Sequence, residues 1–235
     1  MGGGLMQLKQ IAHIEGPYET KFGVPRQAGL AECRARVVFE PEYRVAEALR
    51  GLEGFDYVWL LWGFHLNGRQ EWSPTVRPPR LGGNKRVGVF ATRSPYRPNA
   101  VGLSSVRLIE VTVDAQKGPV LVVEGADLVS GTPIYDIKPY LAYADSHPEA
   151  RSGFAPAAPE TALKVDDPQS LLASLPADLA VALRQSLSLD PRPHYQEDPE
   201  RRYAMLFGGY EVKFHVVDKR LIIDTLDSCE SSRNC

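Results

Sequence analysis

A short segment stiffened by prolines carries the side chains best suited to bind an anion. Residues 92–99 read Thr-Arg-Ser-Pro-Tyr-Arg-Pro-Asn and present Arg93, Arg97 and Asn99. Proline fixes φ and reduces chain freedom, so polar side chains beside prolines are ordered at low entropic cost. The guanidinium fork of arginine matches carboxylate and phosphate groups with two parallel hydrogen bonds. The segment therefore predicts an anion-recognition loop, and the alternative is that each arginine stacks on Phe90 or Tyr96 for structural reasons.

Two titratable residues follow segments that are expected to be strands. His65 comes directly after the apolar run 57–64, and Asp127 follows the predicted strand 119–125. Loops that leave the ends of strands often carry functional residues, and both side chains can accept a proton. The alternatives are a histidine satisfied by a structural hydrogen bond and, for Asp127, an ordinary turn before Ser-Gly-Thr-Pro at 130–133.

Positive charge is concentrated between Arg69 and Arg107. Eight of the 27 Lys and Arg residues and one of the 29 acidic residues fall in this window, which therefore carries +7, while the rest carries −9. The window is rich in Pro and Gly and lacks helical periodicity, so it is expected to form loops. Such a distribution indicates a polyanion or a phosphate-bearing ligand.

The sequence lacks the motifs of three common kinds of functional site: a nucleophile elbow, a metal site and a Rossmann nucleotide site. Gly102-Leu-Ser-Ser105 has no second glycine for a nucleophile elbow. The five histidines and the three cysteines (Cys33, Cys229 and Cys235) lack metal-ligand spacing, so no metal is expected. No strand leads through G-x-G-x-x-G into a helix, which argues against a Rossmann nucleotide site. The cysteine content suits a reducing cytoplasm, and no segment reaches the roughly 20 apolar residues that cross a membrane.

Residues 1–145 are predicted to form a mainly β domain, either a barrel or a sandwich. Six segments have strand length and composition: 10–14, 35–39, 57–62, 87–91, 104–113 and 119–125. The last two flank a turn-like stretch and are expected to pair as a hairpin. The run 57–62 is apolar on both faces, which predicts burial on both sides. Only 44–49, followed by Gly51, is predicted to be a short helix.

The composition changes after residue 145. Residues 146–168 are rich in Ala, Pro, Ser and acidic residues and are predicted to be a linker or long loop. Leucines at helical spacing predict a helix over 170–188, interrupted at Pro176. Segments 210–217 and 221–226 alternate around Asp218-Lys219, which is typical of a hairpin. Residues 169–235 are therefore predicted to be a small α+β domain.

Seven blocks occur in order along the chain: 22–27, 54–65, 75–80, 89–99, 127–133, 136–140 and 190–195. Together they resemble the TsaA-like family, whose characterised bacterial members are tRNA methyltransferases. Two positions depart from that pattern, with Ala100 in place of the usual proline and Ser130 in place of an acid. The resemblance implies a single-sheeted β-barrel that binds S-adenosylmethionine, and a homodimer.

The resemblance also assigns residues to roles. The methyl donor would be held by Pro25, Arg26, Gln27, Phe64, His65, Arg93, Leu103, Glu124, Gly125, Ala126 and Asp127. Substrate or tRNA contacts would come from Arg97, Asn99, Lys138, Tyr140, Asp190, Arg192 and Tyr195. His65 or Asp127 would serve as the catalytic base, with water as the alternative.

The family methylates the N6 nitrogen of threonylcarbamoyladenosine, next to the anticodon. The threonine carboxylate of that base is a natural partner for Arg93 or Arg97, and anticodon phosphates would account for the basic window. Two other functions stay open from the residues alone: a non-catalytic RNA-binding or regulatory barrel, and a methyltransferase for a small molecule on the same fold.

Overall fold

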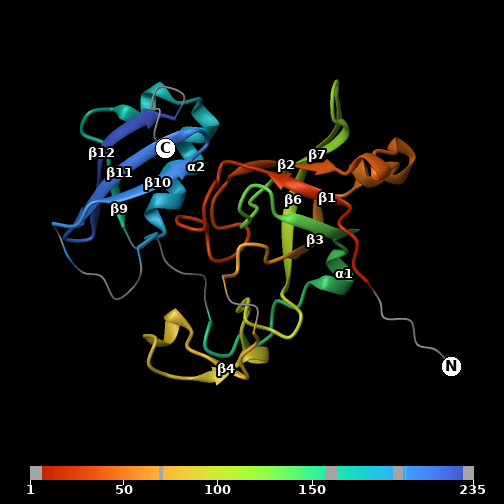
Figure 1. The fold of residues 1–235 in the computed structure, drawn as a ribbon, viewed down its shortest axis with the longest axis horizontal. Helices are drawn as coiled ribbons and strands as arrows, with labels where there is room; N and C mark the ends of the chain where they lie inside the picture. The colour runs from red at the N-terminus through yellow and green to blue at the C-terminus, as the bar shows by residue number, and fades with distance from the viewer. Residues whose placement is uncertain (1–6, 69–70, 157–162, 193–197, 199, 230–235) are drawn as a thin grey trace.

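The computed structural model of the protein describes residues 7–68, 71–156, 163–192, 198 and 200–229. The chain forms two β-rich units side by side, each with its own hydrophobic core (Figure 1). The prediction of a mainly β fold is confirmed. None of the helices in the described part of the chain is long and apolar enough to cross a membrane.

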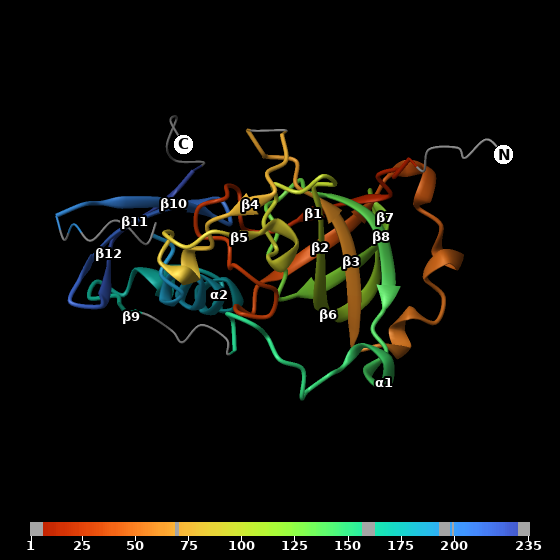
Figure 2. The same cartoon turned by 90° about the horizontal axis from the view of Figure 1, so that it is seen from below.

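The first unit is built from six antiparallel strands. They are β1 (Ala12–Glu15), β2 (Arg34–Phe39), β3 (Tyr57–Gly63), β6 (Val101–Asp114), β7 (Gly118–Glu124) and β8 (Pro133–Pro139). The strands pair in the order β1-β2-β7-β6-β3-β8, and Ala12 of β1 pairs with both Phe39 of β2 and Ile134 of β8. The sheet therefore closes on itself as a barrel (Figure 2). The predicted hairpin over 104–125 is confirmed as β6 and β7.

Strand β3 is buried on one face only, so the prediction of burial on both sides is wrong. Val58 and Leu60 point into the barrel and are fully buried. Trp59 points outward, where its ring lies 5.8 Å from that of Tyr140 and its Nε1 donates to Asp145 at 3.0 Å. Residues 139–145 thus partly cover the outer face, which explains why both faces of this strand are apolar in the sequence.

Two other local predictions differ from the structure. The predicted helix at 44–49 is the single 3₁₀ turn Ala46–Leu49, flanked by the turns Pro41–Tyr43 and Leu52–Gly54, because Gly51 with φ 88° ends the segment. The predicted strand 87–91 is reduced to β5 (Val87–Gly88), which pairs with β4 (Thr75–Val76) outside the barrel. The 3₁₀ turn Val89–Ala91 follows β5, and another, Pro79–Leu81, lies between β4 and β5. The basic window therefore forms a two-stranded excursion with a loop.

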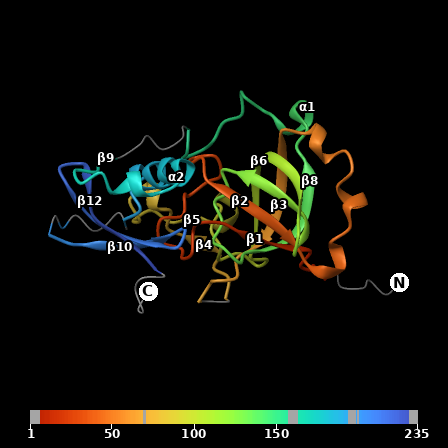
Figure 3. The ribbon, with the colours of Figure 1, turned by 90° about the horizontal axis from the view of Figure 1, so that it is seen from above.

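The second unit is a four-stranded sheet with one helix on its face (Figure 3). Its elements are β9 (Lys164–Asp166), the 3₁₀ turn Leu171–Ser174, α2 (Ala177–Ser188), β10 (Tyr203–Phe207), β11 (Tyr210–Val217) and β12 (Arg220–Ser228). The interruption at Pro176 is confirmed, and Asp218 and Lys219 form the predicted turn with φ of 48° and 60°. Strand β9 lies inside the predicted linker and pairs in parallel with β12. The short helix α1 (Ala142–Asp145) precedes that stretch.

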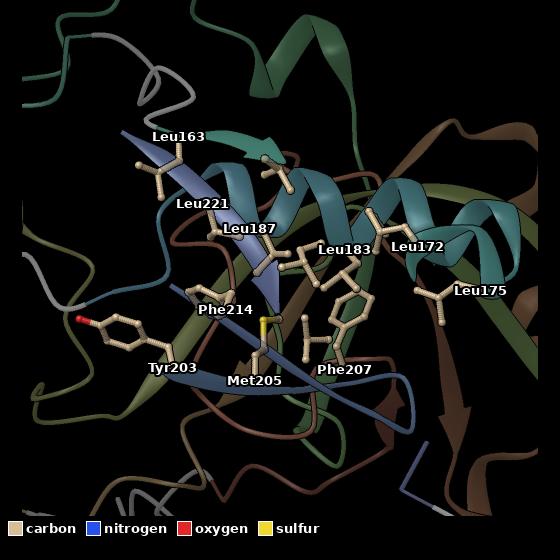
Figure 4. Packing of buried hydrophobic residues seen from close by; sticks show 14 of the residues in the cluster. Leu163, Leu172, Leu175, Leu183, Leu187, Tyr203, Met205, Phe207, Phe214 and Leu221 are labelled. Atoms are coloured by element: carbon tan, nitrogen blue, oxygen red, sulfur yellow. The ribbon is translucent and has the colours of Figure 1, made fainter. Parts of the chain in front are cut away.

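The segment between β1 and β2 inserts into the core of the second unit. In that core, leucines of α2 pack on aromatic and aliphatic side chains of the sheet, including Phe207 and Phe214 (Figure 4). Tyr18 joins them from the first unit, with its ring 5.3 Å from that of Phe207. Its hydroxyl lies 2.6 Å from Ser186 Oγ of α2. The two units are therefore joined by a buried contact as well as by the chain that links them.

Candidate functional site

Two neighbouring cavities lie beside the end of the barrel where β3 ends and β6 begins. The larger encloses about 2200 Å³ and is lined by 26–30, the basic segment 73–86, the loop 90–96, the segment 152–156 and Leu189–Asp190. The smaller encloses about 180 Å³ and is lined mainly by 62–67 and 127–129. Pro95 lines both cavities, so the proline-stiffened loop lies between them.

Three segments far apart in the sequence meet at this loop. Arg93 Nη1 donates to Gln27 Oε1, which ties the loop to the segment 25–29. The backbone N–H of Ala28 lies near the carboxylate of Asp127 and lowers its pKa. One residue on, Gly29 N donates to Gly125 O at 2.8 Å. The structure therefore brings together Arg26–Gln27, Arg93 and Asp127, which the sequence groups only through the family resemblance.

Glycine is required where the first and last of these segments touch. Gly125 has φ 83°, in the left-handed region that favours glycine, and a Cβ there would lie 3.2 Å from both Cα and N of Gly29. A side chain at Gly125 would push the 25–29 segment away from the end of β7. The family-like block 124–127 thus contributes to the site through its backbone as well as through Asp127.

The carboxylate of Asp127 is largely buried and accepts a hydrogen bond from a buried serine. Ser104 Oγ donates to Asp127 Oδ1 at 2.6 Å, and Trp62 Nε1 donates to Ser104 Oγ at 3.0 Å. Burial raises the pKa of Asp127, while the hydrogen bond from Ser104 and the positive charge of Arg93 act in the opposite direction. The carboxylate is therefore a stronger proton acceptor than an exposed aspartate, and it lines the smaller cavity.

His65 lines the same cavity from the end of β3. Its neighbour Phe64 is anchored by a hydrogen bond from its N–H to Ala100 O at 3.0 Å, and the Phe64 ring lies edge-on, 4.4 Å from that of Trp62. Burial, followed by the positive charge of Lys21, lowers the pKa of His65. The imidazole is therefore mainly neutral at neutral pH and can accept a proton.

The second unit contributes a carboxylate to the larger cavity. Asp190 lies there with φ 53°, and Arg192 holds it through two hydrogen bonds of 2.8 Å. Arg26 lies in the same cavity, where burial lowers its pKa. The positive charge of Arg80 also lowers this pKa, whereas the negative charge of Asp190 raises it. The predicted residues Asp190 and Arg192 therefore form a fixed pair beside the basic wall.

Other predicted residues lie away from the cavities or are already engaged. Arg97 donates to the carbonyls of Thr92 at 2.7 Å and Val89 at 3.3 Å, and its guanidinium lies 5.7 Å from the centre of the Phe90 ring. This is the structural arrangement considered as the alternative for that arginine. Neither Arg97 nor the exposed Asn99 is among the residues that line the cavities.

Lys138 and Tyr140 lie at the far end of β3 from His65. Lys138 pairs in register with Trp59, whereas Gly63, next to the site, pairs with Val101. The structure does not bring this pair to the cavities.

The remaining predicted donor residues take varied positions. Leu103 is 53% exposed on the outer face of β6, and Pro25 is buried. The carboxylate of Glu124 faces Arg107 at 3.4 Å and Arg34 at 4.0 Å, and Ala126 belongs to the barrel core. Tyr195 lies outside the described residues.

Sequence reasoning missed three contributors to the site. In the sequence, Ser104 belongs to a segment that lacks the second glycine of a nucleophile elbow, and Trp62 belongs to an apolar run. A polar residue on the inward face of an apolar strand was the available signal for Ser104. The segment 152–156, which lines the larger cavity, fell in the predicted linker and carries no chemical signal of its own.

This barrel with an appended α+β unit defines a known class of protein. Residues 13–146 match the tRNA-methyltransferase O N-terminal domain, and residues 160–228 match the TrmO C-terminal domain. The chain belongs to the tRNA-methyltransferase O family.

Individual relatives agree with this family. The chain is 42% identical over 221 residues to the tRNA (adenine(37)-N6)-methyltransferase of Escherichia coli K12, covering 90% of this chain and 94% of that protein. It is 40% identical to a Pseudomonas aeruginosa protein named putative S-adenosylmethionine-dependent methyltransferase RcsF, covering 87% and 90%. The crystal structure of TrmO from Pseudomonas aeruginosa superimposes with a TM-score of 0.78 at 31% identity, covering 96% of this chain and 99% of that one.

Proposed function

We propose that this protein transfers a methyl group from S-adenosylmethionine to the N6 nitrogen of adenosine 37 of tRNA, beside the anticodon. The observation that carries the proposal is the meeting of Gln27, Arg93 and Asp127 at the boundary between a basic-walled cavity and a small pocket. The names of the relatives support both the tRNA substrate and the methyl donor.

The residues present fit the chemistry of the methyl donor. S-Adenosylmethionine carries a carboxylate, two positively charged groups and an adenine, so its site needs a cation, an anion and an apolar surface. Arg26 supplies the cation, Asp127 the anion and Phe64 the apolar surface. When bound, the donor supplies a methyl group activated by a sulfonium, whose sulfur keeps the electron pair of the broken C–S bond.

The protein's own groups then have two tasks. They align the acceptor nitrogen with the methyl carbon, because proximity and orientation are the main contribution that an enzyme can make to such a transfer. They also accept the proton that N6 loses when it forms its bond to the methyl group. Asp127 fits the second task through its raised pKa and its place in the smaller cavity, and His65 is the neutral alternative beside it.

We further propose that the substrate is adenosine already carrying a threonylcarbamoyl group. Its carboxylate requires a cation within the site, and of the two predicted arginines Arg93 lines the larger cavity whereas Arg97 holds its own loop. The exposed residues Arg77, Arg80 and Arg86 on the wall of that cavity fit the phosphates of the anticodon arm.

A homodimer in the cytoplasm fits this function. Leu103, Tyr96 and Phe90 leave 53%, 42% and 73% of their surfaces exposed, so these side chains are available for contact with a second copy of the chain. Sedimentation would measure the oligomeric state.

The test is methyl transfer in vitro to tRNA with and without the threonylcarbamoyl group, read by nucleoside mass spectrometry. Methylated product at N6 only on the modified tRNA supports the whole proposal. Donor binding without any methyl transfer to tRNA would favour a small-molecule acceptor, and RNA binding without donor binding would favour a non-catalytic barrel. Complementation of a strain lacking the protein, by wild type and by Asp127→Asn, repeats the test in cells.

A further inference from the structure

A directed chain of hydrogen bonds runs from Trp62 through Ser104 to Asp127. The indole N–H of Trp62 can only donate, so Ser104 Oγ must be the acceptor of the 3.0 Å hydrogen bond. The single hydrogen of the serine hydroxyl is then left for Asp127 Oδ1, 2.6 Å away. Asp127 must accept this hydrogen bond, and the nearby backbone N–H groups of Asp127 itself and of Ala28 also lower the pKa of the carboxylate.

The fold is built to accommodate this chain. Trp62 and Ser104 are 8% and 3% exposed and lie on adjacent strands, where Trp62 pairs with Gly102 and Leu60 pairs with Ser104. A Cβ at Gly102 would overlap the indole ring, so only glycine lets Trp62 lie across β6 and reach the serine. A buried serine inside an apolar barrel has no packing advantage over alanine, which leaves the hydrogen bonds as its physical role.

We propose that Trp62 and Ser104 are positioning residues that orient the Asp127 carboxylate and hold it as a hydrogen-bond acceptor at the smaller cavity. The catalytic role of this orientation rests on the proposed function, in which Asp127 receives the proton from the acceptor nitrogen. The orientation itself does not, because it is a property of the protein without substrate.

Other charged and titratable groups act on the same carboxylate. Arg93 approaches from the proline-stiffened loop, and Tyr18 from the segment after β1. His65 and Lys21 line the same cavity. None of these changes when Ser104 is replaced. Loss of the serine hydrogen bond removes the largest influence that opposes burial, so the pKa of Asp127 is expected to rise.

The direct test is a pH titration followed by the indole N–H signals of ¹⁵N-labelled protein. The chain has three tryptophans, and the signal that disappears in Trp62→Phe identifies Trp62. Through Ser104, the Trp62 signal should titrate with Asp127 in the wild type. It should stop doing so in Asp127→Asn and in Ser104→Ala, whereas Ser105→Ala, on the opposite face of the same strand, should leave the titration intact.

Ser104→Thr guards against a merely structural effect, because it retains the hydroxyl and should retain the titration even if the added methyl lowers stability. A Trp62 signal that titrates equally in wild type, Asp127→Asn and Ser104→Ala would overturn the proposal.

The same variants separate this proposal from the proposed function. The base must be ionised, so a raised pKa moves the acidic limb of the pH–rate profile to higher pH. In Ser104→Ala the shift should be on the order of one pH unit, with roughly tenfold slower methyl transfer below the limb and recovery above it. If the Trp62 titration behaves as expected but the acidic limb of the pH–rate profile does not move, Trp62 and Ser104 do orient Asp127, and Asp127 is not the proton acceptor. A uniform loss of rate at every pH, with no change in the Trp62 titration, overturns the chain instead.

Discussion

The two walls of the candidate site differ in how their polar groups are held. Around the smaller cavity, Ser104 is buried on β6 and donates a hydrogen bond of 2.6 Å to Asp127 in the loop after β7. Around the larger cavity, Arg77, Arg80 and Arg86 are exposed on the two-stranded excursion and its loop, and Arg86 Nε donates to Thr75 Oγ1 of strand β4. Groups that act on a reacting atom must be placed before the substrate arrives, whereas groups that attract phosphates act through long-range charge and tolerate motion.

Arg93 combines features of both walls of the site. Its side chain is exposed, yet its guanidinium is tied to Gln27 and so to the backbone that carries Asp127. This position suits a residue that recognises one particular anion next to the reacting groups. The comparison thus predicts a large loss of turnover at Asp127, a smaller one at Arg93 and, at the exposed wall, a loss of tRNA affinity without loss of turnover.

The largest effect is expected for Asp127→Asn, which keeps the shape of the side chain but removes the proton acceptor. Turnover should fall on the order of 10²–10⁴-fold, as for the loss of a general base, while tRNA affinity stays unchanged. Single-turnover methyl transfer and a binding assay measure the two quantities separately. Asp136→Asn is the matched control, because that carboxylate pairs with Lys138 on β8 and lines neither cavity. Full activity of Asp127→Asn would leave His65 or water as the acceptor.

The next effect is expected for Arg93→Lys, which keeps the charge but loses the guanidinium fork. Turnover on threonylcarbamoylated tRNA should fall roughly 10- to 100-fold, the cost of losing a charged hydrogen-bond pair. Wild type should also react very poorly with tRNA that lacks the group, because its cation is then unpaired in the site. Arg97→Lys, which weakens only the loop, should lower the rates on both tRNAs alike.

Equal wild-type rates on modified and unmodified tRNA would contradict carboxylate recognition by either arginine. Calorimetry with S-adenosylmethionine distinguishes a second case: if Arg93→Lys loses donor binding instead, its partner is the carboxylate of the donor.

A smaller effect is expected at the exposed wall. The double variant Arg77→Gln, Arg86→Gln should weaken tRNA binding by about tenfold at low salt and reduce the dependence of log affinity on log salt by roughly 1.5 to 2. Turnover of bound tRNA should not change. Arg50→Gln, an exposed arginine outside both cavities, is the control for the loss of one positive charge. An unchanged salt slope would show that tRNA does not cross this wall.

The smallest effect is expected at the contact between the two units. Ser186 Oγ donates to Ala182 O at 2.8 Å, so the Tyr18 hydroxyl must donate to Ser186. Tyr18→Phe leaves Ser186 with that other bond and should lower the free energy of unfolding by about 1 kcal/mol, with turnover retained. Urea unfolding measures the change, with the exposed Tyr143→Phe as control. A loss of turnover without loss of stability would indicate that this contact controls how Asp190 is presented to the cavity.

The sequence alone was sufficient for features that depend on local patterns. Alternation and turn residues predicted the β6–β7 hairpin and the turn at Asp218-Lys219, because register and turn type follow from neighbouring residues. Pro176 marked the start of α2 since proline cannot continue a helix. Strands β4, β8, β9 and β10 were missed. Strands β4 and β9 have only two and three residues, β8 mixes apolar and charged residues between two prolines, and β10 has no alternation of polar and apolar residues.

The candidate site shows the same division. The family resemblance named Arg26, Gln27, Arg93 and Asp127 as candidates, and the residue types of Arg93 and Asp127 suit anion recognition and proton transfer. Only the tertiary structure decided that Arg97 supports its own loop while Arg93 lines the cavity, since the two have the same chemistry and similar neighbours in the sequence. The link from Trp62 to Asp127 through Ser104 likewise depends on strand register and on the space left by Gly102, which are long-range properties of the closed sheet.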